Sequence, residues 1–85
     1  NRAYHAEVML VQRTAARRGR GNDNVDIGNV IRDPAPDYAK IAQGFGVYAE
    51  GPIADPAALA PAFERALARV RAGEPALVDV ISQPR

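Results

Sequence analysis

The chain has 85 residues, so it corresponds to one small domain or to part of one. Apolar residues make up 47% of it, but 17 of them are alanine, which leaves few large side chains for a core. Since cysteine is absent, neither a disulfide nor a thiolate metal site can stabilise so small a unit. The net charge of +1 argues against nucleic acid as the main partner. No apolar run approaches the roughly 20 residues of a membrane helix.

A first helix is predicted from Tyr4 to about Arg17, because apolar residues recur there at helical spacing. Four consecutive apolar residues begin at Val8, so more than one face of this helix is apolar. A helix that lies on a protein surface usually shows a narrower apolar stripe. The following residues, 18–35, mix glycine, asparagine and charge without any period, which predicts a long loop that is functional or mobile.

A second helix is predicted from Pro36 to about Gly44, with Pro36 in its first turn and Gly46 as its stop. A short strand over 47–50 should follow, closed by Gly51 and Pro52.

The third helix is expected in two parts, because Pro61 lacks the N–H of an interior helical position. A short turn over 56–59 should follow Asp55, and the regular helix should span about 60–72. Its inward face is expected to contain Leu59, Phe63, Leu67 and Val70, with the charged residues Glu64, Arg65, Arg69 and Arg71 mostly outside.

Residues 76–81 form a nearly continuous apolar run after a helix, which is typical of a strand buried in a parallel sheet. The stretch 47–81 therefore predicts a strand–helix–strand unit with parallel strands. Two strands alone cannot bury so apolar a strand, so further strands should flank it. We expect an α/β fold, with the 85 residues as a C-terminal segment of a larger domain.

Two other features favour structural interpretations. Arginines 13, 17, 18 and 20 could bind phosphate, but they also suit a solvated helix end, and Asp23 follows at once. His5 is the only histidine, which excludes a histidine-rich metal cluster and favours a surface or packing role.

The opening residues, Asn-Arg-Ala-Tyr-His-Ala-Glu before an apolar helix, carry the most informative pattern. They resemble the second half of the cofactor signature of thiamine-diphosphate-dependent enzymes. The order of the later segments agrees: a loop, the Pro-Asp-Tyr-Ala-Lys-Ile-Ala helix, a short strand, a helix and the closing strand. Over all 85 residues, the chain resembles the C-terminal part of the thiamine-diphosphate-binding domain of an acetolactate-synthase-like or benzoylformate-decarboxylase-like enzyme. This implies a parallel-sheet, three-layer α/β domain, of which this segment holds two strands and about three helices.

The resemblance implies a role for three residues at the start of the chain. Asn1 would give its amide oxygen to Mg²⁺, and Ala3 would give its main-chain carbonyl to the same ion; both oxygens suit this metal. The N–H groups of the helix that starts near Tyr4 would point at the diphosphate. The alternative for Asn1 is a simple helix-capping role.

Two further residues are candidates by the same resemblance. Glu7 matches a glutamate that acts in proton transfer in the pyruvate-decarboxylase branch, and the alternative is an exposed carboxylate beside the helix dipole. Leu10 matches a position where relatives place a side chain against the substrate, and the alternative is packing.

The resemblance implies a cytoplasmic enzyme that uses thiamine diphosphate and Mg²⁺ to decarboxylate or ligate small 2-oxo acids. The remainder of the parent polypeptide would supply the missing metal ligand and the rest of the sheet. A homodimer or homotetramer is expected, with no nucleic acid or membrane partner. The competing hypothesis is a non-catalytic α/β interaction module.

Overall fold

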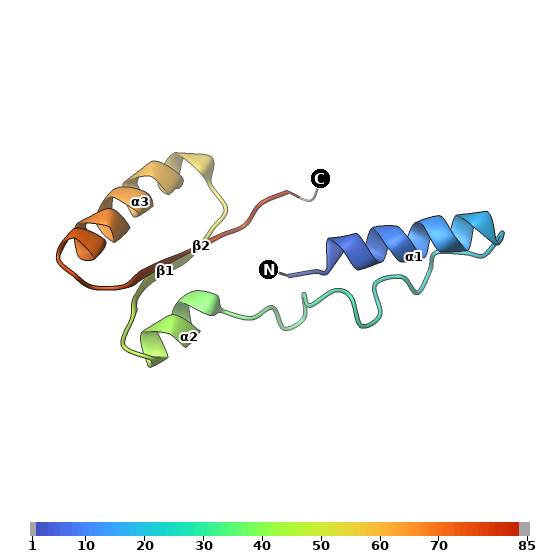
Figure 1. Ribbon diagram of the computed structural model, residues 1–85, viewed down its shortest axis with the longest axis horizontal. Helices are drawn as coiled ribbons and strands as arrows, with labels where there is room; N and C mark the ends of the chain where they lie inside the picture. The colour runs from blue at the N-terminus through green and yellow to red at the C-terminus, as the bar shows by residue number, and fades with distance from the viewer. Residues whose placement is uncertain (1, 84–85) are drawn as a thin grey trace. The chain divides into compact units, whose positions relative to one another are not determined.

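The computed structural model describes residues 2–83 and divides them into two compact units (Figure 1). The first unit extends to Pro36, and the second begins at Asp37. The elements in chain order are helix α1 (His5–Arg17), helix α2 (Tyr38–Gly44), strand β1 (Tyr48–Ile53), helix α3 (Pro56–Arg71) and strand β2 (Ala76–Val80).

The first unit consists of α1 and the loop that follows it. Helix α1 starts one residue after the predicted position and ends at Arg17, as predicted. Residues 18–36 contain no regular helix or strand, but they include a run of turns over 23–29. After these turns, Val30 pairs with Ala3 in an isolated antiparallel bridge. The loop therefore starts at the C-terminal end of α1 and contacts the residues that precede its N-terminal end.

Helix α2 starts at Tyr38, two residues later than predicted. The Asp37 side chain accepts a hydrogen bond from the N–H of Lys40 (2.9 Å), so Asp37 is the N-cap residue. Pro36 precedes this cap and does not belong to the first turn. After the helix, Gly46 has a φ of +76°, which closes the helix as predicted.

The two strands pair in parallel, as predicted for a strand–helix–strand unit. Tyr48 lies opposite Ala76, and Ile53 lies opposite Val80, with an irregularity in register between Glu50 and Ile53. The prediction that Gly51 ends the first strand is wrong, because β1 continues through it to Ile53. Glycine is required at this bulge: its φ is +135°, and an added Cβ would lie 2.6 Å from the carbonyl oxygen of Asp79.

Helix α3 is one continuous helix, so the predicted interruption before Pro61 is wrong. A proline inside a helix removes one hydrogen bond and costs about 3 kcal/mol. Several features favour the helix nevertheless. Asp55 caps it by accepting from the N–H of Ala57 (2.9 Å), Pro56 suits its first turn, and alanine is frequent along it.

The second unit has three layers, with α2 and α3 on opposite faces of the sheet (Figure 1). On one face, Ala39 and Ala42 of α2 pack with Ala49 of β1 and Leu77 of β2. On the other face, Glu50 of β1 contacts α3 through Arg65. The predicted α/β class with two parallel strands and three helices is therefore confirmed.

The face that α3 turns to the sheet differs from the predicted one. Ala62 and Ala66 are its buried residues, whereas Phe63, Leu67 and Val70 are about half exposed. Arg65 is exposed, as expected, and its guanidinium reaches Glu50 of β1. The small alanines permit a close approach of α3 to the sheet, and the ion pair of Arg65 with Glu50 lies on the flank of the helix next to β1.

Tyr48, Glu50 and Arg65 form a polar network in the second unit. The Arg65 guanidinium donates to both carboxylate oxygens of Glu50, from Nε at 2.8 Å and from Nη2 at 2.6 Å. The Tyr48 hydroxyl donates to the same carboxylate, and the Arg69 guanidinium lies 5.0 Å from the centre of the Tyr48 ring. Hydrogen bonds from Arg65 and then Tyr48 lower the pKa of Glu50 to about 2. The hydrogen bond to Glu50 raises the pKa of Tyr48.

This network should make stability depend on acidic pH. Because the pKa of Glu50 falls from 4.5 to about 2 in the fold, its contribution is complete above about pH 4.5 and is lost as the pH drops toward 2. Glu50→Gln should lower the melting temperature by a few degrees at pH 6 and flatten its decline between pH 5 and 2. Thermal unfolding measured across this range tests the prediction, with the exposed Glu64→Gln as control. An equal acid dependence in Glu50→Gln and the parent protein would contradict it.

Candidate functional site

The stretch that leads into α1 is held from one side by the loop. The Tyr4 N–H donates to the carbonyl of Asn29 (2.8 Å), and the Ile31 N–H donates to the carbonyl of Arg2 (2.7 Å). These two bonds flank the pair of Ala3 with Val30. Ala3 itself is buried. Residues 2–4 thus have a defined backbone direction.

The carbonyl of Ala3 points away from the loop. In a trans peptide unit the C=O and the N–H point in opposite directions. The carbonyl of Ala3 and the N–H of Tyr4 belong to one such unit, and that N–H points at Asn29. The Ala3 oxygen is therefore directed outward, as a main-chain metal ligand would have to be.

The N-terminal end of α1 has no side-chain cap. Tyr4 occupies the N-cap position without a capping hydrogen bond, and the N–H groups of the first turn have no acceptor within the helix at His5 and Ala6. The N–H of Tyr4 is taken by Asn29, so the groups open to an anion begin at His5. An uncapped helix N-terminus favours an anion, because the N–H groups and the helix dipole act together.

Glu7 and Leu10 lie on one flank of α1. They are three residues apart, which makes them neighbours on a helix surface. Both are exposed, whereas Val8, on the adjacent face, is buried. The structure thus brings together Ala3, Tyr4 and Glu7 around the first turn, with Leu10 one turn further on. Asn1, the remaining predicted site residue, lies outside the described residues.

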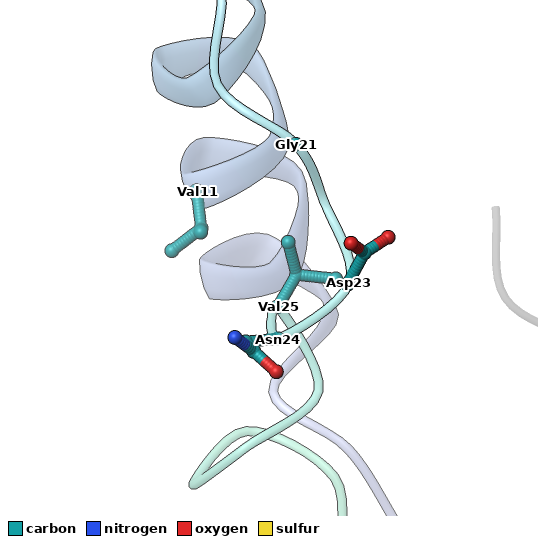
Figure 2. A pocket seen from close by; sticks show the side chains of 5 residues that line it. All are labelled: Val11, Gly21, Asp23, Asn24 and Val25. Atoms are coloured by element: carbon teal, nitrogen blue, oxygen red, sulfur yellow. The ribbon is translucent and has the colours of Figure 1, made fainter.

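The first unit also contains a shallow, open hollow of about 320 Å³ between α1 and the loop. It is lined by Val11 on the helix and by Gly21, Asp23, Asn24 and Val25 on the loop (Figure 2). None of the predicted site residues lines it. Its single carboxylate, that of Asp23, gives it no evident chemistry. Val25 of the loop and Val11 of the helix both line this hollow.

No set of three or more histidine, cysteine or acidic side chains gathers as a metal cluster within residues 2–83. Within the same residues, no helix has both the length and the apolar character to cross a membrane.

The sequence did not predict the contact between the loop and residues 2–4. Its only signal is weak: Val30 and Ile31 are two adjacent apolar residues in a loop that is mostly polar but also contains Val25 and Ile27. A two-residue contact of this kind has no detectable period, so only the folded chain reveals it.

The structure therefore contains a three-layer α/β unit with a parallel sheet and, in the other unit, a helix whose N-terminal end suits an anion. Comparison with protein families makes this specific. The sequence model of the family described as thiamine pyrophosphate enzyme, C-terminal TPP binding domain, matches residues 1–80. The chain therefore belongs to this family, whose cofactor is thiamine diphosphate. Comparisons with curated proteins and with solved structures give no significant match.

Proposed function

We propose that the chain supplies half of the Mg²⁺–diphosphate clamp in an enzyme that decarboxylates or ligates 2-oxo acids. Membership of the thiamine pyrophosphate enzyme family supports the cofactor, and it favours an enzyme over a non-catalytic interaction module. The acetolactate-synthase-like or benzoylformate-decarboxylase-like subtype belongs to this proposal. The single observation that carries the assignment to these residues is the outward carbonyl of Ala3 beside the uncapped start of α1.

The residues present fit this cofactor. The Asn1 amide and the Ala3 carbonyl would be neutral oxygen ligands for Mg²⁺, and the N–H groups of His5 and Ala6 can hold the diphosphate. When bound, thiamine diphosphate supplies the electron sink for breaking or making the bond next to the substrate carbonyl. The chain's own contribution is to position this cofactor and to shape one wall of the substrate pocket.

Glu7 is the proposed proton-transfer group. It is one turn into the helix from the proposed metal ligands, and it is exposed in this chain. Its place beside the proposed clamp suits a carboxyl that exchanges a proton with the reacting substrate. Leu10, on the same flank, would contact the substrate through its apolar side chain.

The remainder of the parent enzyme would complete both the site and the fold. The large apolar side chains Phe63, Leu67 and Val70 lie on the flank of α3 opposite Arg65, which contacts β1. They therefore lie on the flank of α3 that faces away from β1. We propose that a further strand pairs with the edge of β2 opposite β1 and is covered by these side chains. A homodimer or homotetramer with an active site between subunits also belongs to this proposal.

The first test concerns the metal clamp. In the complete enzyme, Asn1→Ala should weaken apparent Mg²⁺ and thiamine-diphosphate affinity by about tenfold or more, because a metal ligand is lost. Equilibrium binding of the cofactor over a range of Mg²⁺ concentrations measures this. Asn22→Ala, which changes an exposed asparagine of the loop, is the matched control. Equal affinities in Asn1→Ala and this control would exclude the metal role.

The second test concerns proton transfer. Glu7→Gln should lower kcat by roughly 10²- to 10⁴-fold with cofactor saturating, since the amide cannot exchange a proton in the transition state. Cofactor affinity should change little. Glu64→Gln, another exposed helical glutamate, should keep the parental rate. A kcat within twofold of the parent enzyme would show that Glu7 has no acid–base role.

The third test concerns the expected neighbouring strand. If Leu67 is covered in the complete enzyme, Leu67→Ser should destabilise it by about 1–3 kcal/mol through lost apolar burial. The exposed Arg71→Ser should change stability by less than about 0.5 kcal/mol. Urea unfolding of both variants decides the matter, and equal midpoints would argue against a strand at this edge.

A further inference from the structure

The loop after α1 is hydrogen-bonded to the rest of the first unit at both of its ends. At the C-terminal end of α1, the N–H of Arg20 donates to the carbonyl of Ala15 (2.9 Å). Midway, Val25 of the loop and Val11 of the helix line the same open hollow (Figure 2). At the other end, residues 29–31 bind residues 2–4. The loop therefore follows α1 back to its N-terminal end and has a defined path.

A compact turn immediately before the contact fixes its position. The main-chain N–H groups of Asn29 and Val30 both donate to the carbonyl of Asp26, at 3.1 and 3.0 Å. The Asn29 side chain adds a bond from Nδ2 to the carbonyl of Val25 (3.0 Å). Gly28, with a φ of +78°, allows the chain to reverse within this turn. Asn29 is thus held by its main chain and its side chain.

The contact acts directly on the peptide unit that carries the Ala3 carbonyl. The carbonyl of Asn29 accepts from the Tyr4 N–H, and that N–H is rigidly coupled to the Ala3 carbonyl across one planar peptide. The second bond, from Ile31 to Arg2, fixes the preceding peptide. Without these bonds, a short stretch ahead of a helix would sample many backbone directions, and ordering it would weaken ligand binding.

We infer that Asn29 and Ile31 are positioning residues, which orient the Ala3 carbonyl for the metal and couple the order of the loop to cofactor binding. This inference rests on the proposed function of Ala3. Coupling of this kind is reciprocal: if an ordered loop favours cofactor binding, bound cofactor must stabilise the loop to the same extent.

The decisive variant removes one main-chain donor. Ile31→Pro deletes the N–H that bonds to Arg2, whereas Ile31→Ala removes most of the same side chain and keeps that N–H. In the complete enzyme, Ile31→Pro should bind Mg²⁺ and thiamine diphosphate about threefold to tenfold more weakly than Ile31→Ala, as expected for one lost hydrogen bond. kcat at saturating cofactor should differ by less than twofold between the two.

A second pair of variants contains no new proline, so it tests the same contact without the wider disturbance of the loop that a proline could cause. Asn29→Ala and Asn29→Asp both lose the Nδ2 donor to Val25, and both should weaken cofactor binding about threefold. Asn24→Ala, an exposed neighbour in the same loop, should bind cofactor like the parent enzyme.

Amide hydrogen exchange supplies a readout that does not depend on activity. In the cofactor-free parent enzyme, the Tyr4 amide should exchange slowly, and it should exchange faster in Ile31→Pro and Asn29→Ala. Adding thiamine diphosphate with Mg²⁺ should slow exchange at Ile31 in the parent enzyme. Unprotected Tyr4 and Ile31 amides in both states would overturn the inference.

The outcomes separate this inference from the proposed function. If Asn1→Ala weakens cofactor binding but Ile31→Pro equals Ile31→Ala, the positioning role is wrong and the metal clamp stands. If Asn1→Ala binds cofactor normally, the metal clamp is wrong, and the positioning role falls with it.

Discussion

The main constraint on this chain is a shortage of large buried side chains. Its buried residues are seven alanines and one valine, and no large side chain is fully buried within the described part. Alanines allow α2 and α3 to approach the sheet closely, but each buries little apolar area. Polar contacts supplement this small core, among them the bidentate pair of Arg65 with Glu50 on the exposed side of the unit. The same shortage agrees with a role as one part of a larger enzyme.

The orientation of α3 illustrates what the sequence could and could not predict. Periodicity located the helix correctly, but its apolar stripe was read as the inward face. The structure uses that face only in part: Ala62 and Ala66 are the buried residues of α3, and Arg65 on its flank pairs with Glu50 of β1. A long-range ion pair between residues 15 positions apart leaves no local signal. We attribute the exposure of Phe63, Leu67 and Val70 to the proposed further strand, which would cover these side chains in the parent enzyme.

Glycine and proline residues predicted where helices end, but they did not predict whether a strand or helix continues through them. Gly46 and Gly73 close helices with positive φ, as expected of C-terminal glycines. Gly51 and Pro61 were taken as breaks, yet β1 and α3 continue through them. In each case neighbouring structure outweighs the local cost: β2 pairs on both sides of the bulge, and a capped, alanine-rich helix surrounds the proline. Such tertiary compensation lies beyond a single-sequence pattern.

The start of α1 shows why a motif alone does not define a site. The resemblance named residues whose chemistry suits a metal and a diphosphate, but it could not say what orients them. A main-chain carbonyl ligand, as proposed for Ala3, depends on backbone direction and not on its side chain, so its alignment must come from hydrogen bonds elsewhere. Asn29 and Ile31 provide these bonds from about 26 residues away in the chain. Sequence variation at Ala3 would therefore say little about this function, whereas changes to the turn around Asn29 should alter it.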